Sequence, residues 1–261
     1  MKDPNQKETG NVATSKKTGK EPVIEINNLQ KFFGHQEVLK SISLNLFPGE
    51  NIAVLGKSGG GKSVLIKCIV RLLDADGGTI NVFGQNVNDL NKAELGKLRQ
   101  KIGFLFQSGA LYDSMTVKEN LEFPLRRIKK GLSETQIAEK VNEVLENVGL
   151  ADALNKMPSQ LSGGMRKRVS LARTVIVDPM IMLYDEPTTG LDPVTSDEIS
   201  ALINEIQEKY KTSSIIITHD IKCARTTADR IIMINEGEIY LEGKVEDFEK
   251  SADPLIKSFF M

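Results

Sequence analysis

Residues 56–63 read GKSGGGKS, and this short stretch decides the fold. It fits the pattern GxxxxGK[ST], in which glycines let the backbone curl until successive N–H groups point at phosphate oxygens. Lys62 would then reach the β and γ phosphates of a nucleotide, and the hydroxyl of Ser63 could ligate Mg²⁺. A flexible Gly-Ser loop without a ligand is the alternative. The phosphate interpretation predicts a site made by eight consecutive residues, namely Gly56, Lys57, Ser58, Gly59, Gly60, Gly61, Lys62 and Ser63.

The segments around this stretch favour the phosphate site. NIAVLG, residues 51–56, is a short continuous apolar run that ends in glycine, as expected of a strand buried on both faces in a parallel sheet. A helix is expected to follow directly, from Lys62 to Leu73. MIMLYDEP at 180–187 and SSIIIT at 213–218 predict two further buried strands. This order of strand, glycine loop and helix predicts an α/β fold with a P-loop NTPase core.

Two segments of different character accompany this core. The stretch at 23–47 contains VIEINNLQKFF and SISLNLF, which alternate apolar and polar side chains and predict an N-terminal antiparallel β subdomain. Residues from about 108 to 178 show little strand signal, and SETQIAEKVNEVLENVGL within them has a capping box at Ser133 and Gln136. We therefore expect one domain over 22–261, with a helical lobe at about 108–178, and a disordered polar tail at 1–21.

Composition excludes several classes of protein. The 261 residues carry 34 Lys and Arg against 35 Asp and Glu, a formal charge of −1, which does not favour a nucleic-acid or anionic-membrane partner. The two cysteines lack CxxC spacing, so they indicate neither a disulfide framework nor a metal site, and a reducing compartment fits best. The apolar runs are too short to cross a bilayer. A membrane role would therefore need a separate subunit.

Polar residues end three of the expected strands. Asp185 is placed to hold the water shell of Mg²⁺, and Glu186 to polarise an attacking water, although an ordinary acidic turn is the alternative. His219 could contact a γ-phosphate, but a lone histidine is more often structural. Gln107, at the end of KIGFLFQ, could touch the metal's water shell and a mobile loop.

Two further features are ambiguous by themselves. Phe33 is either plain core or a side chain that stacks on adenine. LSGGM at 161–165 starts a basic amphipathic helix, where Ser162 is a good N-cap and Gly163 and Gly164 free the backbone amides. This pattern could be a helix cap alone, or a second anion site.

The chain resembles the nucleotide-binding subunit of an ATP-binding cassette (ABC) transporter over essentially all of residues 23–261. Seven elements occur in that family's order, namely Phe33, GKSGGGKS, Gln107, LSGGM, IMLYDE, TTGLD and His219. The resemblance implies a role for each: Phe33 as the adenine platform, residues 56–63 as Walker A, Gln107 as the Q-loop, Ser162, Gly163 and Gly164 as the signature, Asp185 as the Walker B acid, Glu186 as the general base, Asp192 as the D-loop and His219 as the switch. Mg²⁺ would lie at Ser63, Gln107 and Asp185.

The resemblance also explains two phosphate cradles in one small protein. In this family two subunits face head to tail, so that the signature of one covers the γ-phosphate bound by the Walker A of the other. It implies an enzyme that hydrolyses ATP as a homodimer docked on transmembrane permease subunits. The expected location is peripheral, on the cytoplasmic face of the inner membrane.

Within the family, the sequence looks like the ATPases of the lipid-asymmetry type, associated with Mla or Mce systems. The likeness lies in FLFQSGALYDSMTVKENLEFPLRR at 104–127, in LSGGMRKR and in DPLIKSFF. Met165 stands where the common signature has Gln, and Val64 where Thr is usual. Lipid transport between bacterial membranes and a partner with an Mce domain are implied. The permease would meet a largely apolar surface made by Ala110, Leu111, Tyr112, Met115 and Pro124.

Two alternatives stay open. An importer of a small solute, such as an amino acid or ion, would share every nucleotide motif. A soluble ABC protein of DNA repair or translation is the other, but such proteins generally carry tandem cassettes, zinc modules or long coiled coils, for which this sequence has no signal.

Overall fold

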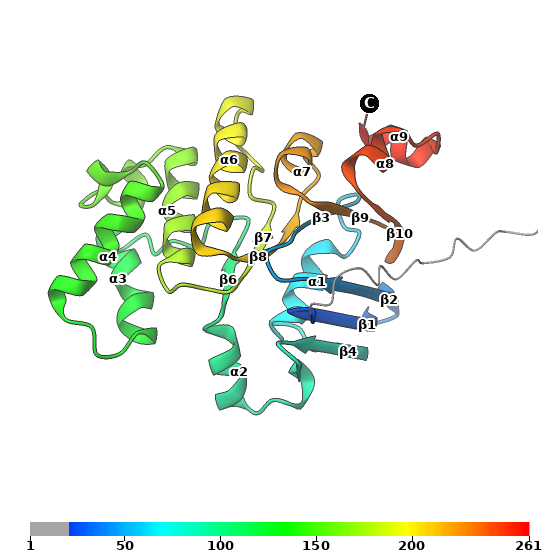
Figure 1. Cartoon of the computed structure of the whole chain (residues 1–261), viewed down its shortest axis with the longest axis horizontal. Coiled ribbons are helices and arrows are strands. Elements are labelled where there is room, and N and C mark those ends of the chain that lie inside the picture. Colours follow the sequence, from blue (N-terminus) through cyan, green and yellow to red (C-terminus); the bar gives the residue numbers. More distant parts are fainter. Residues whose placement is uncertain (1–20, 261) are drawn as a thin grey trace, which may run out of the picture.

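The computed structural model describes residues 21–260. The expected disordered tail, at 1–21, lies outside these residues except for Glu21. Two sheets and a group of helices form the described part of the chain (Figure 1). No helix within it combines the length and the apolar character needed to cross a membrane.

A six-stranded sheet forms the centre, in the order β10-β9-β3-β8-β7-β6. Its strands are β3 Asn51–Leu55, β6 Ile102–Leu105, β7 Ile181–Asp185, β8 Ser213–Ile217, β9 Arg230–Asn235 and β10 Glu238–Gly243. All pairs are parallel except β9 with β10, which form an antiparallel hairpin. Every residue of β3, β7 and β8 is buried, as their continuous apolar sequences predict.

The second sheet is antiparallel, with the order β2-β1-β4-β5. It comprises β1 Ile24–Phe33, β2 Gln36–Leu46, β4 Gly77–Val82 and β5 Gln85–Asn86. Helix α1, Lys62–Ile69, lies between the two sheets in one hydrophobic core (Figure 1). The predicted β subdomain on a P-loop α/β core is therefore confirmed.

Helix α1 ends four residues before the expected Leu73. Arg71 adopts a left-handed conformation with φ of 51°, and the N–H of Leu72 donates to the carbonyl of Lys67 at 2.8 Å. This geometry is that of a helix C-terminus, where a left-handed residue redirects the chain. Apolar periodicity continued through the turn because Leu72 and Leu73 follow it, so the sequence did not reveal the end.

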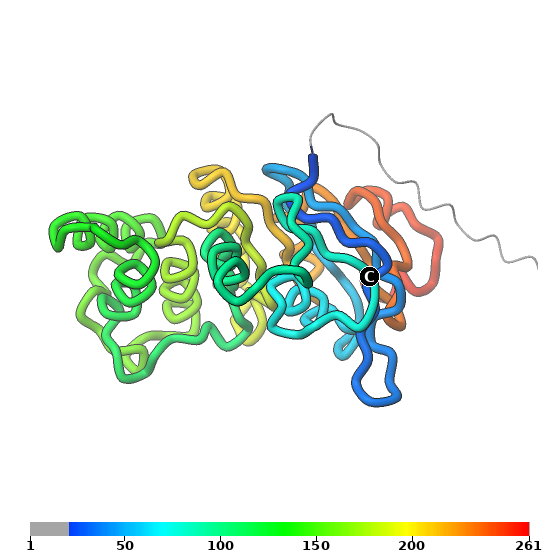
Figure 2. Tube along the Cα trace, turned by 90° about the horizontal axis from the view of Figure 1, so that it is seen from below, coloured from blue at the N-terminus to red at the C-terminus, as the bar shows by residue number. Residues whose placement is uncertain are grey.

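Helices fill the segment between β6 and β7. They are α3 Val117–Ile128, α4 Glu134–Asn147 and α5 Gly163–Val175, with short 3₁₀ turns, and the structure has no strand at 108–178. The capping box predicted at Ser133 is present at the start of α4. These helices and α6 share a second hydrophobic core. In the Cα trace, α3, α4 and α5 form one end of the described part of the chain (Figure 2). A further helix, α2 Lys92–Arg99, precedes β6.

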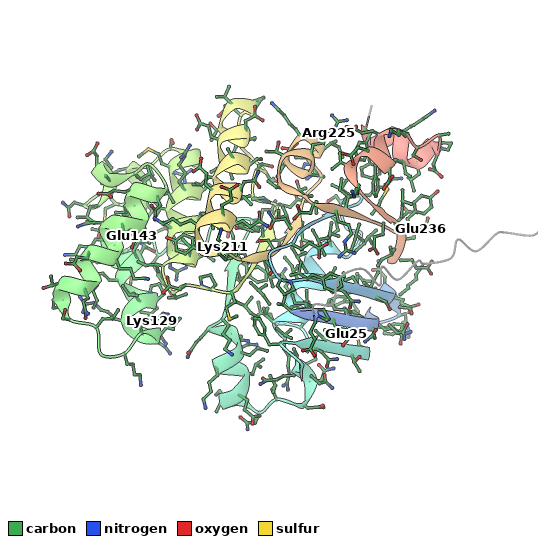
Figure 3. The ribbon with its side chains drawn as sticks, viewed as in Figure 1. Glu25, Lys129, Glu143, Lys211, Arg225 and Glu236 are labelled. Atoms are coloured by element: carbon green, nitrogen blue, oxygen red, sulfur yellow. The ribbon has the colours of Figure 1, made fainter. Side chains whose placement is uncertain are left out.

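The remaining helices cover the outer faces. Helices α6 Pro193–Tyr210 and α7 Ile221–Thr227 lie on the face of the central sheet opposite α1 (Figure 1). Two short helices, α8 Val245–Glu249 and α9 Pro254–Phe260, pack against β9 through buried Phe248. Charged side chains such as Glu143, Arg225 and Glu236 point outward (Figure 3).

Candidate functional site

The polar residues that the sequence singled out gather at one edge of the central sheet. Strands β3, β7 and β8 are adjacent and parallel, so the segments that follow them leave the sheet at the same edge. These segments are the glycine loop at 56–61, the acidic pair Asp185 and Glu186, and His219. The adjacency of β7 and β8 could not be known from the sequence.

The glycine loop leads directly into α1, as the motif predicts. Gly61 precedes the helix with φ of 88°, and a Cβ there would lie 2.7 Å from Leu39 Cδ2 and 2.9 Å from the carbonyl oxygen of Val38. A Cβ on Gly56 would overlap the carbonyl oxygen of Ile234. Glycine is thus required by space at both positions. The N-terminus of α1 presents free N–H groups and a positive helix dipole, both of which favour an anion.

Lys62 is held inside this loop. It is 6% exposed, and its Nζ donates to the carbonyl oxygens of Gly56 at 2.8 Å and Lys57 at 3.0 Å. Burial lowers the pKa of Lys62, and the nearby carboxylates of Glu186 and Asp185 partly offset this effect. The ammonium group is therefore fixed at the loop, where a phosphate would compete with the two carbonyls for it.

Ser63 and Asp185 form a direct hydrogen bond at this edge. The Ser63 hydroxyl donates to Oδ1 of Asp185 at 2.6 Å, although 122 residues separate them in sequence. Asp185 is buried at the end of β7. A hydroxyl and a carboxylate side by side are oxygen donors of the kind that Mg²⁺ prefers.

Glu186 and His219 form the second pair. Oε2 of Glu186 lies 2.7 Å from His219 Nδ1 and accepts a hydrogen bond from Thr189 Oγ1 at 3.0 Å. The glutamate side chain is largely buried, with 13% exposed, whereas 61% of the histidine side chain is exposed. The two residues were identified separately from the sequence, and their contact was not predicted. A carboxylate held by an imidazole that faces solvent can accept a proton from a water molecule.

Gln107 contacts Lys167, a residue that was not predicted to belong to the site. The Gln107 side chain is exposed, while its carbonyl oxygen accepts a hydrogen bond from Lys167 Nζ at 2.8 Å. Lys167 is buried on α5, and burial lowers its pKa. In the sequence, Lys167 looks like part of the basic, exposed face of the helix that starts at LSGGM. Its importance becomes visible only when the buried side of α5 is known.

The signature residues lie beside the loop that carries Asp192. The Ser162 hydroxyl accepts a hydrogen bond from the Met165 N–H at 3.2 Å, which makes it the N-cap of α5. A Cβ on Gly164 would lie 2.5 Å from Thr195 Cγ2, so α5 and α6 approach closely there. The carboxylate of Asp192 caps α6 by accepting from Thr195 N at 3.0 Å. Among the described residues, no hydrogen bond or ion pair joins 162–164 to the loop at 56–63.

Phe33 lies near the end of the long hairpin formed by β1 and β2. Its side chain is 47% exposed, which excludes plain core, the first of the two alternatives. The Lys31 ammonium lies 5.5 Å from the centroid of its ring. An exposed aromatic ring beside a cation is available for stacking.

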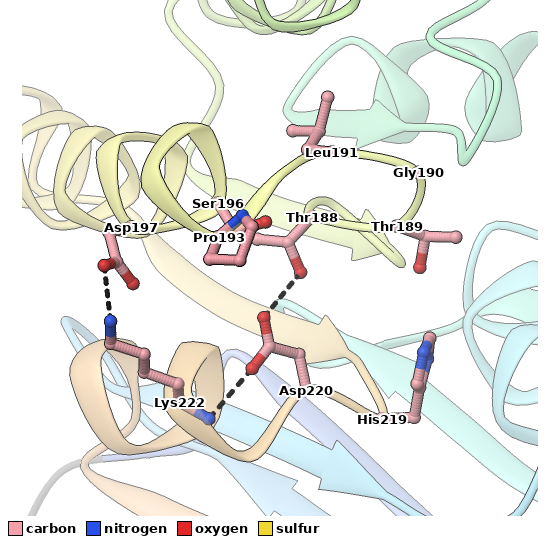
Figure 4. Close-up of a pocket in the computed structure, with 10 residues that line it drawn as sticks. All are labelled: Thr188, Thr189, Gly190, Leu191, Pro193, Ser196, Asp197, His219, Asp220 and Lys222. Atoms are coloured by element: carbon pink, nitrogen blue, oxygen red, sulfur yellow. Dashed lines mark hydrogen bonds and ion pairs between the residues drawn. The ribbon is translucent and has the colours of Figure 1, made fainter.

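A hollow of about 350 Å³ lies beside His219 and Thr189, the residue whose hydroxyl donates to Glu186 (Figure 4). The Thr188 hydroxyl donates to Asp220 Oδ2 at 3.1 Å within it, and Lys222 forms an ion pair with Asp197 (Figure 4). The hollow therefore connects the segment of His219 with the start of α6. Its lining comprises Thr188, Thr189, Gly190, Leu191, Pro193, Ser196, Asp197, His219, Asp220 and Lys222.

Sequence comparison agrees with this geometry. Residues 39–189 match the model of a family described as ABC transporter. The probable ribonucleotide transport ATP-binding protein mkl of Mycobacterium tuberculosis is 39% identical over 90% of this chain and 66% of its own length. The methionine import ATP-binding protein MetN of Rhizobium johnstonii is 38% identical, over 89% of this chain and 64% of its own. The chain thus spans slightly less than two thirds of either relative.

A third relative covers a larger share of its own length. The chloroplastic protein trigalactosyldiacylglycerol 3 of Arabidopsis thaliana is 37% identical over 91% of this chain and 73% of its own. Among solved structures, the dimeric ATP-binding cassette MJ0796, in a post-hydrolysis state bound to ADP and Pi, superposes with a TM-score of 0.78. The cassette MJ0796 is 34% identical to this chain, and the match covers 85% of this chain and 98% of MJ0796.

Proposed function

This chain belongs to the ABC transporter family and is an ATP-binding cassette ATPase; from that premise we propose that it drives lipid transport between bacterial membranes. The observation that supports the ATPase chemistry best is the contact between Glu186 and His219 at the sheet edge that carries the glycine loop. The observations that favour lipid lie in the segment after Gln107.

The glycine loop is proposed to bind the phosphates of ATP. Its backbone N–H groups, the N-terminus of α1 and the Lys62 ammonium all supply positive potential. The oxygens of Ser63 and Asp185, 2.6 Å apart, fit Mg²⁺, and the exposed Gln107 amide at the same edge could add a third ligand. When bound, Mg²⁺ would neutralise charge on the phosphates. Phe33 is proposed to stack on the adenine.

Glu186 is proposed as the general base. Its carboxylate is oriented by the Thr189 hydroxyl and by His219, so it is positioned before a water molecule arrives. The exposed edge of the imidazole leaves His219 free to contact the γ-phosphate as well. Loss of that phosphate would then change the contact between the two side chains, which is the behaviour expected of a switch.

A second copy of the chain is proposed to complete each site. The signature at 162–164 contacts the start of α6 in its own chain, through Gly164 and Thr195, and not its own glycine loop. The related cassette with ADP and Pi is dimeric, which supports the pairing of two copies. Both phosphate cradles are then used, one from each subunit.

The lipid assignment is supported by sequence and by surface character. The segment at 104–127 and Met165 resemble the lipid-asymmetry type, and one relative, trigalactosyldiacylglycerol 3, is named after a glycolipid. Tyr112 and Phe123 are exposed and meet edge to face with ring centroids 5.3 Å apart. We propose that this aromatic pair contributes to the permease surface that also includes Ala110, Leu111, Met115 and Pro124. The assembly would lie on the cytoplasmic face of the inner membrane and include a protein with an Mce domain.

Import of a small solute is the second candidate. The identity is 38% with the methionine import protein and 37% with trigalactosyldiacylglycerol 3, so sequence identity alone does not separate the two candidates.

One experiment tests both parts of the proposal. The chain is coexpressed with ABC permease subunits of its own genome, the complex is purified in detergent, and bound small molecules are identified by mass spectrometry. Enrichment of phospholipid over a control complex, with ATP hydrolysis that the lipid stimulates, supports the proposal. Enrichment of an amino acid or ion without lipid would favour the importer. A Glu186→Gln complex serves as the matched control for hydrolysis.

A further inference from the structure

One buried lysine connects three segments around the site. Lys167 lies on α5, one turn after Ser162–Gly164, and only 6% of it is exposed. Its Nζ donates to the Gln107 carbonyl oxygen at 2.8 Å and lies 3.5 Å from the carbonyl oxygen of Glu186. A single ammonium group on the signature helix thus contacts two backbone segments, the one that follows β6 and the one that follows β7.

Burying this group carries a cost. Desolvation lowers the pKa of Lys167, and the charges of Asp185 and Glu186 only partly oppose that effect. A methionine would fill similar space without desolvating a charge. The ammonium therefore contributes through the contacts it makes, and not through the volume it fills.

The backbone at Glu186 is one that such a contact can stabilise, and its carbonyl oxygen accepts from Lys167 Nζ at 3.5 Å and from the Thr189 N–H at 3.4 Å. Glu186 has φ of 51°, a left-handed conformation that is unfavourable for a residue other than glycine. Its N–H donates to the Ile217 carbonyl at 2.9 Å, and its carbonyl oxygen faces Lys167. The conformation fixes the direction of the Glu186 side chain toward His219, so a relaxed turn would move the carboxylate.

The loop after Gln107 is fastened to the same face of α5. A Cβ on Gly109 would lie 2.5 Å from Ser170 Oγ, so this loop packs closely on the helix. Arg173 Nη1 donates to the Ala110 carbonyl oxygen at 3.1 Å. Residues 167, 170 and 173 recur every three positions and so lie on one face. Of these three, Lys167 also contacts the turn at Glu186.

We propose that Lys167 is a positioning residue, which holds the turn at Glu186 and the Gln107 segment to the signature helix. The inference rests on the proposed ATPase function, in which the signature contacts the nucleotide of the second subunit. When the dimer closes and α5 moves, Lys167 then transmits this movement to the turn at Glu186 and so to its carboxylate. Lys167 itself touches no reacting atom.

Hydrolysis kinetics test this role in the full-length chain. Lys167→Met is expected to lower kcat about tenfold or more, because a small displacement of the base is costly, while KM for MgATP changes less than twofold. Its thermal midpoint should change little, because the loss of the contacts to two carbonyl oxygens and the removal of a desolvated charge oppose each other. Lys167→Gln keeps an N–H donor and should recover part of kcat. Lys140→Met, on α4, removes an ammonium that pairs with Asp178 and should match the wild type.

Hydrogen exchange without nucleotide tests the contacts independently of turnover. Lys167→Met should increase exchange in peptides covering 107–110 and 186–189, and Lys140→Met should not. Unchanged exchange in both peptides would overturn the inference even if the chain proved inactive, whereas absence of wild-type hydrolysis would count against the proposed function. The inference would also be overturned if Lys167→Met lowered kcat only in proportion to a lowered thermal midpoint and Lys167→Gln recovered none of the lost kcat.

Discussion

His219 Nδ1 lies 2.7 Å from Oε2 of Glu186, and the pair joins the ends of two neighbouring parallel strands, β7 and β8. The histidine side chain is mostly exposed and the glutamate mostly buried, so the pair faces outward from a protected carboxylate. Glu186 is thus suited to accept a proton, and His219 to contact a bound ligand.

Replacing Glu186 by Gln should remove the base and keep its shape. We expect ATP turnover to fall roughly 10²- to 10⁴-fold, the range for loss of general acid or base catalysis, while nucleotide binding is retained. Phosphate release measures turnover, and light scattering after gel filtration with ATP measures dimer formation, which should increase. Steady-state hydrolysis at the wild-type rate would rule out Glu186 as the base.

Replacing His219 by Ala should lower kcat roughly a hundredfold, as expected when one oriented polar group is removed from a site of charge development. Binding of nucleotide should change little, because the glycine loop and Lys62 stay intact. The measurement is a comparison of kcat with the dissociation constant for a fluorescent ATP analogue. A variant that binds poorly but turns over normally when saturated would assign His219 to binding.

Gly61 and Gly59 provide a matched test of the loop. Both have positive φ, 88° and 80°, but only Gly61 is crowded by Val38 and Leu39, whereas nothing lies within 4 Å of a Cβ on Gly59. Each Ala substitution should cost about 1 kcal/mol of left-handed strain, and Gly61→Ala a further 1–3 kcal/mol from overpacking. Urea unfolding measures the difference. Equal destabilisation by the two variants would contradict the close approach.

Much of the fold follows from local patterns, and the contacts of the site do not. The buried strands, the glycine loop and the capping box at Ser133 are each specified by consecutive residues. The contact of Glu186 with His219 depends on which strands are neighbours, and the burial of Lys167 on how α5 packs. Both features are set by residues far away in the sequence. Glu186 and His219 could therefore be predicted as site residues, but their contact could not, and neither could the role of Lys167.

The two cysteines should be unreactive in the folded protein. Burial raises the pKa of Cys68 and of Cys223 to about 11, so the thiolate is scarce at neutral pH. Because the unfolded pKa is lower, near 9, deprotonation should lower stability as the pH rises from about 9 to 11. Alkylation followed by mass spectrometry at pH 8 should be slow without urea and fast in urea. Fast labelling of either thiol in the native protein would contradict its burial.

The composite site makes the sharpest prediction, because it can be tested with two inactive proteins. Ser162→Arg blocks a signature, and Lys62→Ala disables a glycine loop, so neither variant alone should hydrolyse ATP. In a mixed dimer, one site combines the intact loop of the first chain with the intact signature of the second. Random mixing at equal ratio makes half of the dimers mixed, each with one of two sites intact, so about a quarter of wild-type activity should return. If each chain used its own signature, every site in the mixture would contain a defect, and no ratio of the two variants would restore activity.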